Sequence, residues 1–227
     1  MYSKASNATS ALEEEVRKTV EQGLDVQERV RQATLRIVRD RSFDIKSLQE
    51  TTRAVLRGAS AGVEKDMERS SEQAKAGREH LKQAVSGLDL ALAQFAEAAK
   101  LAVEEASGRA QRYSSEDLKR AHADLKKLET MFLDSLKATS SATKSAAGDI
   151  LGDLWSHAKA NGSAVGRQMQ DTLGAIAHQL GATGRAQAGA GLHLAQNTSN
   201  MLRQIAAGML SGLAEQIKPG KPGDKGA

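Results

Sequence analysis

Histidine is the residue of this sequence best suited to metal binding or acid–base chemistry, because the chain contains no cysteine. None of the histidines forms an H-E-x-x-H motif or another pair four residues apart, and no cluster of carboxylates surrounds them. The five are His80, His122, His157, His178 and His193. His157 and His178 would share one face of an unbroken helix, but glycines lie between them. We therefore expect no metal site and no catalytic histidine.

Other catalytic and cofactor motifs are also absent from the sequence. It has no phosphate-binding loop G-x-x-x-x-G-K-[ST], no G-x-G-x-x-G after a strand and no nucleophile elbow G-x-S-x-G. The sequence predicts a non-enzymatic protein with no catalytic or cofactor-binding residues and no cofactor. A net charge of +4, without a dense basic stripe, is not typical of a nucleic-acid-binding protein. We therefore do not expect nucleic acid to be a partner.

The placement of proline and charge predicts long helices of two kinds. No proline occurs between Met1 and Lys218, and only 3% of the residues are aromatic. Residues 1–144 carry 48 charged side chains, whereas residues 145–217 carry eight and hold 11 of the 20 glycines. We expect an all-α fold in which extended amphipathic helices form a helical bundle or a coiled-coil-like assembly.

The charged half is predicted to form a long-helix hairpin or coiled-coil region over residues 10–113, after a flexible N-terminus at residues 1–9. Ser10 and Glu13 have the spacing of a capping box, which predicts a helix start. The apolar stripe behind them includes Leu24 and extends to Ile37. The predicted end of this first helical segment is at residues 39–44.

The second segment has the clearest helical periodicity of the chain. Apolar and small residues recur every three or four positions from Ile45 to Ala106, which predicts a helix of about 90 Å if it is continuous. The stripe is weak in its middle, where a bend is expected, at Ser70, Ala74 and Gly77.

Residues 114–217 are predicted to form a second helical region, which is Ala/Gly-rich and low in charge from residue 145. Its apolar stripe is strong between Leu118 and Leu136 and resumes at Ile150. The predicted interruptions are at Asn161-Gly162 and at Gly181–Gly191. A flexible Lys/Pro/Gly tail follows at residues 218–227.

The apolar residues of the low-charge region are our candidates for contact with a surface or a partner. They keep helical spacing in separate segments, and they are Ile150, Leu154, Trp155, Leu173, Ile176, Leu180, Leu202, Ile205, Met209, Leu213 and Ile217. The segment 202–217 has few charges, so insertion into a neutral apolar surface or packing against partner helices fits it better than attachment to anionic lipid. Trp155 has two interpretations, a core residue of a bundle or an anchor at an interface.

Three pairs of glycines four residues apart are candidates for close packing between helices. An interior glycine costs a helix about 0.5–1 kcal/mol relative to alanine, so such pairs are unfavourable unless close packing compensates. The pairs are Gly148 with Gly152, Gly162 with Gly166, and Gly208 with Gly212. The alternative interpretation is a frayed C-terminal half that is merely rich in alanine and glycine.

Two resemblances add to this interpretation. The Ala/Gln/Ser-rich helices without cysteine, such as Leu125–Leu136 and Gly166–Leu180, resemble the phasins, which coat bacterial polyhydroxyalkanoate granules. The Lys-Pro tail is similar to the basic tails of some phasins. The segment Glu116–Leu136, continued by Asp149–Leu154 and Val165–Arg167, resembles a family of uncharacterised proteobacterial helical proteins with no known activity. Neither resemblance implies catalytic residues.

These observations lead to two hypotheses about function. In the first, residues 145–217 adsorb on an apolar surface, a polyhydroxyalkanoate granule or lipid, while the charged helices project or oligomerise. In the alternative, the chain is an oligomeric helical scaffold or interaction protein with no lipid or polymer contact. Under both we expect a homo-oligomer, and we expect a cytoplasmic protein, peripheral to a granule or membrane under the first.

Overall fold

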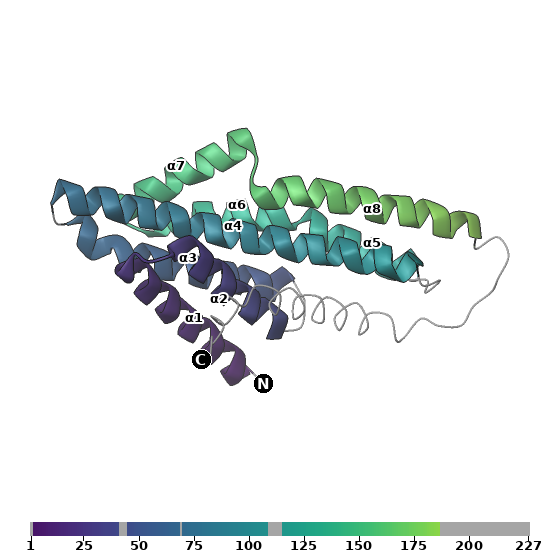
Figure 1. Ribbon diagram of the computed structural model, residues 1–227, viewed down its shortest axis with the longest axis horizontal. Helices are drawn as coiled ribbons and strands as arrows, with labels where there is room; N and C mark the ends of the chain where they lie inside the picture. The colour runs from purple at the N-terminus through teal and green to yellow at the C-terminus, as the bar shows by residue number, and fades with distance from the viewer. Residues whose placement is uncertain (1, 41–44, 69, 109–114, 187–227) are drawn as a thin grey trace, which may run out of the picture.

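The computed structural model describes residues 2–40, 45–68, 70–108 and 115–186, and all of its regular secondary structure within these ranges is α-helical. The helices are α1 (Tyr2–Gln22), α2 (Val26–Asp40), α3 (Ile45–Met67), α4 (Ser71–Gly108), α5 (Ser115–Lys126), α6 (Leu128–Ala142), α7 (Ala146–Asn161) and α8 (Ala164–Ala186). They form an elongated bundle with α4 along its length (Figure 1). The predicted all-α bundle is confirmed. The predicted helix start at Ser10 is wrong, because α1 begins at Tyr2.

The first predicted stripe is folded into two helices rather than one. Between α1 and α2, Gly23 and Asp25 have φ values of +67° and +48°. Glycine adopts this left-handed region freely, and aspartate does so more readily than most residues. Leu24, which we counted in the stripe, lies at this turn and is 68% exposed. Because Val20 and Val26 are both buried, the apolar periodicity continues across the turn and conceals it.

The long second segment is a helical hairpin, broken at its weak middle between α3 and α4. A Cβ on Gly77 would lie 3.2 Å from Asp66 Cβ and 3.3 Å from Met67 Cε. The start of α4 therefore packs against the end of α3, and the two helices run antiparallel. The bend that we predicted is confirmed, and the continuity that the sequence left open is decided against one 90 Å helix. With 38 residues, α4 alone is about 57 Å long.

Three glycines of this hairpin bring helix backbones into direct contact. A Cβ on Gly58 of α3 would overlap the carbonyl oxygen of Glu13 in α1. One turn further along, a Cβ on Gly62 would lie 2.8 Å from the carbonyl oxygen of Arg17. The residue numbers of the two pairs rise together along α3 and α1, so these helices run parallel. On α4, a Cβ on Gly87 would overlap the carbonyl oxygen of Gln27 in α2 in the same way.

The interface between α2 and α4 also holds a buried charge. The Arg31 side chain of α2 is only 8% exposed, and its Nε donates a hydrogen bond to Glu28 Oε2 at 2.8 Å. The same guanidinium reaches across to Gln94 of α4. A buried guanidinium needs such partners, because leaving one unpaired is strongly destabilising. The network therefore favours one register of α2 on α4.

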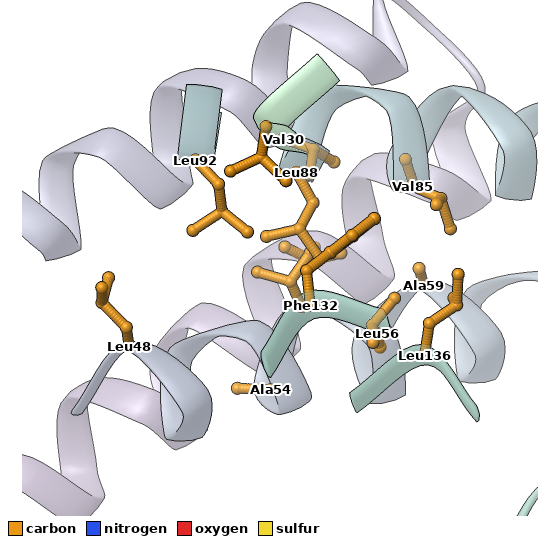
Figure 2. Close-up of a cluster of buried hydrophobic side chains, with 14 of the residues drawn as sticks. Val30, Leu48, Ala54, Leu56, Ala59, Val85, Leu88, Leu92, Phe132 and Leu136 are labelled. Carbon is orange, nitrogen blue, oxygen red and sulfur yellow. The ribbon is translucent and has the colours of Figure 1, made fainter. Parts of the chain in front are cut away.

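One apolar core runs through the bundle, from Leu12 in α1 to Ile176 in α8. Its largest fully buried side chain is Phe132 of α6, which lies among Leu56 of α3 and Leu88 of α4 (Figure 2). Replacing such a side chain by alanine typically costs about 3–5 kcal/mol. The core therefore joins the charged half of the chain to the low-charge half in a single structure.

The second helical region follows our prediction at one joint and departs from it at another. The predicted interruption at Asn161-Gly162 is confirmed, because α7 ends at Asn161 and Gly162 has a φ of +79°. The interruption predicted from Gly181 is wrong for residues 181–186, which continue α8. Residues 187–191 lie outside the described ranges.

We predict that Gly58→Ala destabilises the bundle by about 1–3 kcal/mol, since the new methyl group would overlap a backbone oxygen that cannot move without shifting α1. Gly174→Ala on α8 is the matched control, because a Cβ there meets nothing within 4 Å. It should stabilise the protein by about 0.5–1 kcal/mol. Urea unfolding followed by circular dichroism measures both. A Gly58→Ala protein as stable as the Gly174→Ala protein would contradict the close crossing.

Candidate interaction surface

The structure divides the predicted contact residues of α7 and α8 into two classes. Ile150 and Ile176 are 1% and 0% exposed, so in this structure neither is a surface contact, and both belong to the protein's own core. Leu154, Trp155 and Leu173 are partly buried and pack against that core. Among the candidates whose side chains the structure describes, only the exposed atoms of these three residues could touch another surface directly.

The other predicted contact residues are not located by the structure. The side chain of Leu180 in α8 lies outside what the structure describes, and so does the whole segment 202–217. The apolar residues concerned there are Leu202, Ile205, Met209, Leu213 and Ile217. They remain predictions from the sequence.

The third glycine pair lies in that same segment. Gly208 and Gly212 are both outside the described residues, so the structure assigns no helix contact to either of them. Close packing at Gly208 and at Gly212 therefore stays a prediction from their spacing, unlike the two pairs nearer the N-terminus.

The side chain of Trp155 links α7 to α6. The ammonium nitrogens of Lys137 in α6 and Lys159 in α7 each lie 5.0 Å from the centroid of its ring. An ammonium over an indole face is attracted by the ring quadrupole. The ring packs on the core, as the first interpretation of Trp155 expects, and two cations lie over it, whereas anchoring at an interface stays a prediction.

The first glycine pair lies in the first half of α7, facing the end of α6 and the turn that follows it. A Cβ on Gly148 would overlap the carbonyl oxygen of Thr143, and one on Gly152 would lie 3.2 Å from Ser140 Oγ. Ser140 Oγ also donates a hydrogen bond to the carbonyl oxygen of Gly148 at 2.8 Å. Here the small residues do let two helix ends approach closely.

The second pair has a different role in the structure. Gly162 has a positive φ and a Cβ there would meet nothing within 4 Å, so the prediction of close packing at Gly162 is wrong. It is the joint between α7 and α8. At Gly166 a Cβ would overlap the carboxylate of Glu129 from α6. The missing side chain at Gly166 leaves room for a carboxylate over the first turn of α8.

The N-terminus of α8 is held by a carboxylate from α4, an arrangement that we call the Asp89 clamp. Asp89 Oδ2 accepts a hydrogen bond from the amide of Ala164 at 2.7 Å, and Oδ1 accepts one from the amide of Val165 at 2.9 Å. Ser163 Oγ accepts a third from the amide of Gly166 at 2.9 Å. The free amides of the first turn are thus satisfied, and negative charge lies at the positive end of the helix dipole.

A second carboxylate and a second hydrogen bond extend this contact. Ser163 Oγ donates to Glu129 Oε1 at 3.2 Å, so α6 also reaches the start of α8. Further along, Thr172 Oγ1 donates to the carbonyl oxygen of Ala96 at 3.1 Å. The pairs Asp89/Val165 and Ala96/Thr172 are seven residues apart on both helices. Therefore α4 and α8 run parallel.

Burial raises the pKa of the Asp89 carboxyl above its ordinary value of 3.8, and the nearby charge of Glu129 acts in the same direction. The amide hydrogen bonds from Val165 and Ala164 and the charge of Arg167 act in the opposite direction but do not cancel it. Burial therefore penalises the charged form of Asp89 more than these partners favour it.

Sequence reasoning missed two features of this structure. The pair Gly58/Gly62 has the same four-residue spacing as the pairs that we selected, but we searched for that spacing only in the low-charge region. The Asp89 clamp has no local signal, because Asp89 lies 75 residues from Ala164. The pair Asn161-Gly162 indicated the joint between α7 and α8, but it did not indicate that Asp89 holds the start of α8.

The described residues offer no arrangement for metal chemistry and none for crossing a membrane. In the ranges that the structure describes, no group of three or more histidine, cysteine, aspartate or glutamate side chains could hold a metal ion. None of the helices within those ranges is long and apolar enough to span a bilayer. The features that the structure brings together within those ranges are contacts between helices.

Comparison with known proteins identifies one family. A model described as Family of unknown function (DUF6781) matches residues 2–219. No curated protein and no solved structure matches the chain.

We predict that Asp89 makes the free energy of unfolding depend on pH. Between pH 3.8 and its raised folded-state value, the folded chain holds a proton at Asp89 that the unfolded chain releases, so stability falls as pH rises through this window. The wild type should therefore gain stability relative to Asp89→Asn as pH is lowered from 7 towards 4.5. Urea unfolding of both proteins across this range measures the difference. Asp153→Asn, at an exposed position of α7, is the control. Parallel stability curves for the wild type and Asp89→Asn would contradict the prediction.

Proposed function

The chain belongs to DUF6781, a family of unknown function, and from this premise we propose that it is a non-enzymatic helical protein that associates with an apolar surface. The surface is a polymer granule or a lipid layer. Helices α1–α8 form a folded bundle that holds the segment 202–217 near the apolar surface, and this segment makes the first contact with it. The proposed location is cytoplasmic and peripheral to that surface.

The observation that carries the proposal is where the apolar side chains of the described bundle lie. From Leu12 to Ile176, the apolar stripes pack against one another in one core. Among the described residues, the exposed large hydrophobic side chains are Leu24 and Leu101, which are 68% and 41% exposed. Scattered exposed leucines are ordinary and form no adsorbing patch. The bundle thus offers little to an apolar surface, whereas the segment 202–217 has an apolar stripe with few charges.

This proposal narrows the first sequence hypothesis. That hypothesis assigned all of residues 145–217 to adsorption, but residues 146–161 and 164–186 form α7 and α8 of the bundle. The resemblance to phasins supports a coating role, since phasins act at the surface of polyhydroxyalkanoate granules. No cofactor is part of this function.

The second candidate is an oligomeric helical scaffold with no lipid or polymer contact. It is favoured by the burial of Ile150 and Ile176, because two side chains that adsorption would use are already engaged in helix packing. Under this function the surface of the bundle meets further copies of the chain or a partner protein. Light scattering tests it, since a scaffold gives a discrete oligomer of the 24.1 kDa chain.

We predict that the full-length chain floats with neutral phosphatidylcholine vesicles, or with isolated polyhydroxyalkanoate granules, in a density gradient. A chain shortened to residues 1–201 should float at least about tenfold less, since it lacks the apolar segment. A chain shortened to residues 1–217 is the matched control, because it lacks only the basic tail, and it should float like the full-length chain. Full-length protein that stays in the soluble fraction with both surfaces would refute the proposal. A discrete oligomer in that fraction would support the scaffold instead.

A further inference from the structure

Helix α8 is attached to the bundle differently from α1. The backbone of α1 is in direct contact with α3 at Gly58 and Gly62, so the two helices interlock. In α8, the cross-helix hydrogen bonds are made by the side chains of Asp89, Ser163 and Thr172. A Cβ on its exposed Gly174 would meet nothing within 4 Å. Helix α8 is thus attached through side-chain packing and side-chain hydrogen bonds, without an interlocked backbone crossing at its described glycines.

The face that α8 turns to the bundle is suited to a second surface. Val165, Met169 and Ile176 on this face are buried, and Leu173 is partly buried beside them. The opposite face is polar and exposed, with Arg167, Gln170, Asp171 and His178. A helix with one apolar and one polar face can lie on α4 or on an apolar surface with the same residues.

The joint before α8 allows it to move alone. Gly162 has a positive φ and open space around the position of its missing side chain. The helix before it is held independently, because α7 packs on α6 through Gly148 and Trp155. In Figure 1, α8 runs away from this joint along the outside of the bundle. Rotation about Gly162 would therefore lift α8 from α4, while α1–α4, α6 and α7 keep their contacts with one another and α5 loses its contact with α8.

We propose that α8 is a releasable strap, whose apolar face passes from α4 to the apolar surface when the protein binds. The inference rests on the proposed function of surface association and adds a second contact element to it. The Asp89 clamp is the point of control, because it fixes the first turn of α8 to α4. Glu129 from α6 and Arg167 from α8 are the other charged groups that face Asp89.

A reversible lock tests the strap in the full-length chain. The protein has no native cysteine, so Ala96→Cys and Thr172→Cys place a single pair of thiols where α4 and α8 meet. We expect the oxidised, locked protein to bind neutral phosphatidylcholine vesicles at least about tenfold more weakly, and reduction to restore binding. Each single-cysteine variant is a matched control and should bind alike in both redox conditions. Equal binding of the locked and reduced protein would overturn the inference.

A second measurement tests the strap without any surface. Native-state hydrogen exchange should show α8 opening separately from α1 and α3, and Asp89→Ala should accelerate exchange in α8 at least about fivefold. Asp153→Ala, at an exposed position of α7, should leave the exchange of α8 unchanged. Exchange of α8 only together with α1 and α3 in the Asp89→Ala protein would overturn the inference, whether or not the disulfide forms.

The outcomes separate the strap from the proposed function. If the wild type does not bind vesicles or granules but α8 opens separately in hydrogen exchange, the proposed function fails and the strap stands as a property of the fold. If the wild type binds, α8 does not open separately in hydrogen exchange, and the locked and reduced proteins bind equally, the strap fails and the proposed function stands. Trp155, the only tryptophan, should keep its emission maximum on binding, because α7 stays on α6.

Discussion

The backbone contacts at Gly58, Gly62 and Gly87 are the constraint on which the rest of the bundle depends. They determine the distance at which α1 lies on α3 and α2 on α4, because no side chain separates the helices there. At this distance the valines and leucines of the four helices meet in one core, and Arg31 of α2 reaches Gln94 of α4. The helices α6, α7 and α8 complete a core that this arrangement has already positioned. Polar contacts contribute less to the arrangement of the helices, since the Asp89 clamp joins α8 to α4 where the apolar core already brings them together.

Periodicity predicted the all-α fold, the α3–α4 hairpin and the joint at Gly162, because each follows from local residue pattern. It did not predict the turn at Gly23, since the apolar period continues from Val20 to Val26 across it. The glycines after residue 180 suggested a break that α8 does not have before Ala186. Propensity is a weak signal beside tertiary contact, and a helix lying on α4 tolerates glycine.

The candidate site was predictable only where its residues are neighbours in sequence. Ile150 and Ile176 were recognised as apolar and helical, but a stripe in the sequence does not show whether its partner is another surface or the same chain. The structure assigns both to the core. Asp89 was one of many charged residues on a helix, and its partner amides are 75 and 76 residues away. Contacts of this kind depend on the whole arrangement of helices, which no local spacing specifies.

The distance in sequence between Asp89 and α8 has a consequence for how the chain is made. A polypeptide leaves the ribosome from its N-terminus, so α1–α4 emerge and can pack before any part of α8 has been synthesised. During that interval the side of α4 that later carries α8 has no covering helix, while the carboxylate of Asp89 keeps it partly polar. The nascent protein therefore passes through a stage in which this side of α4 is accessible, before α8 covers it.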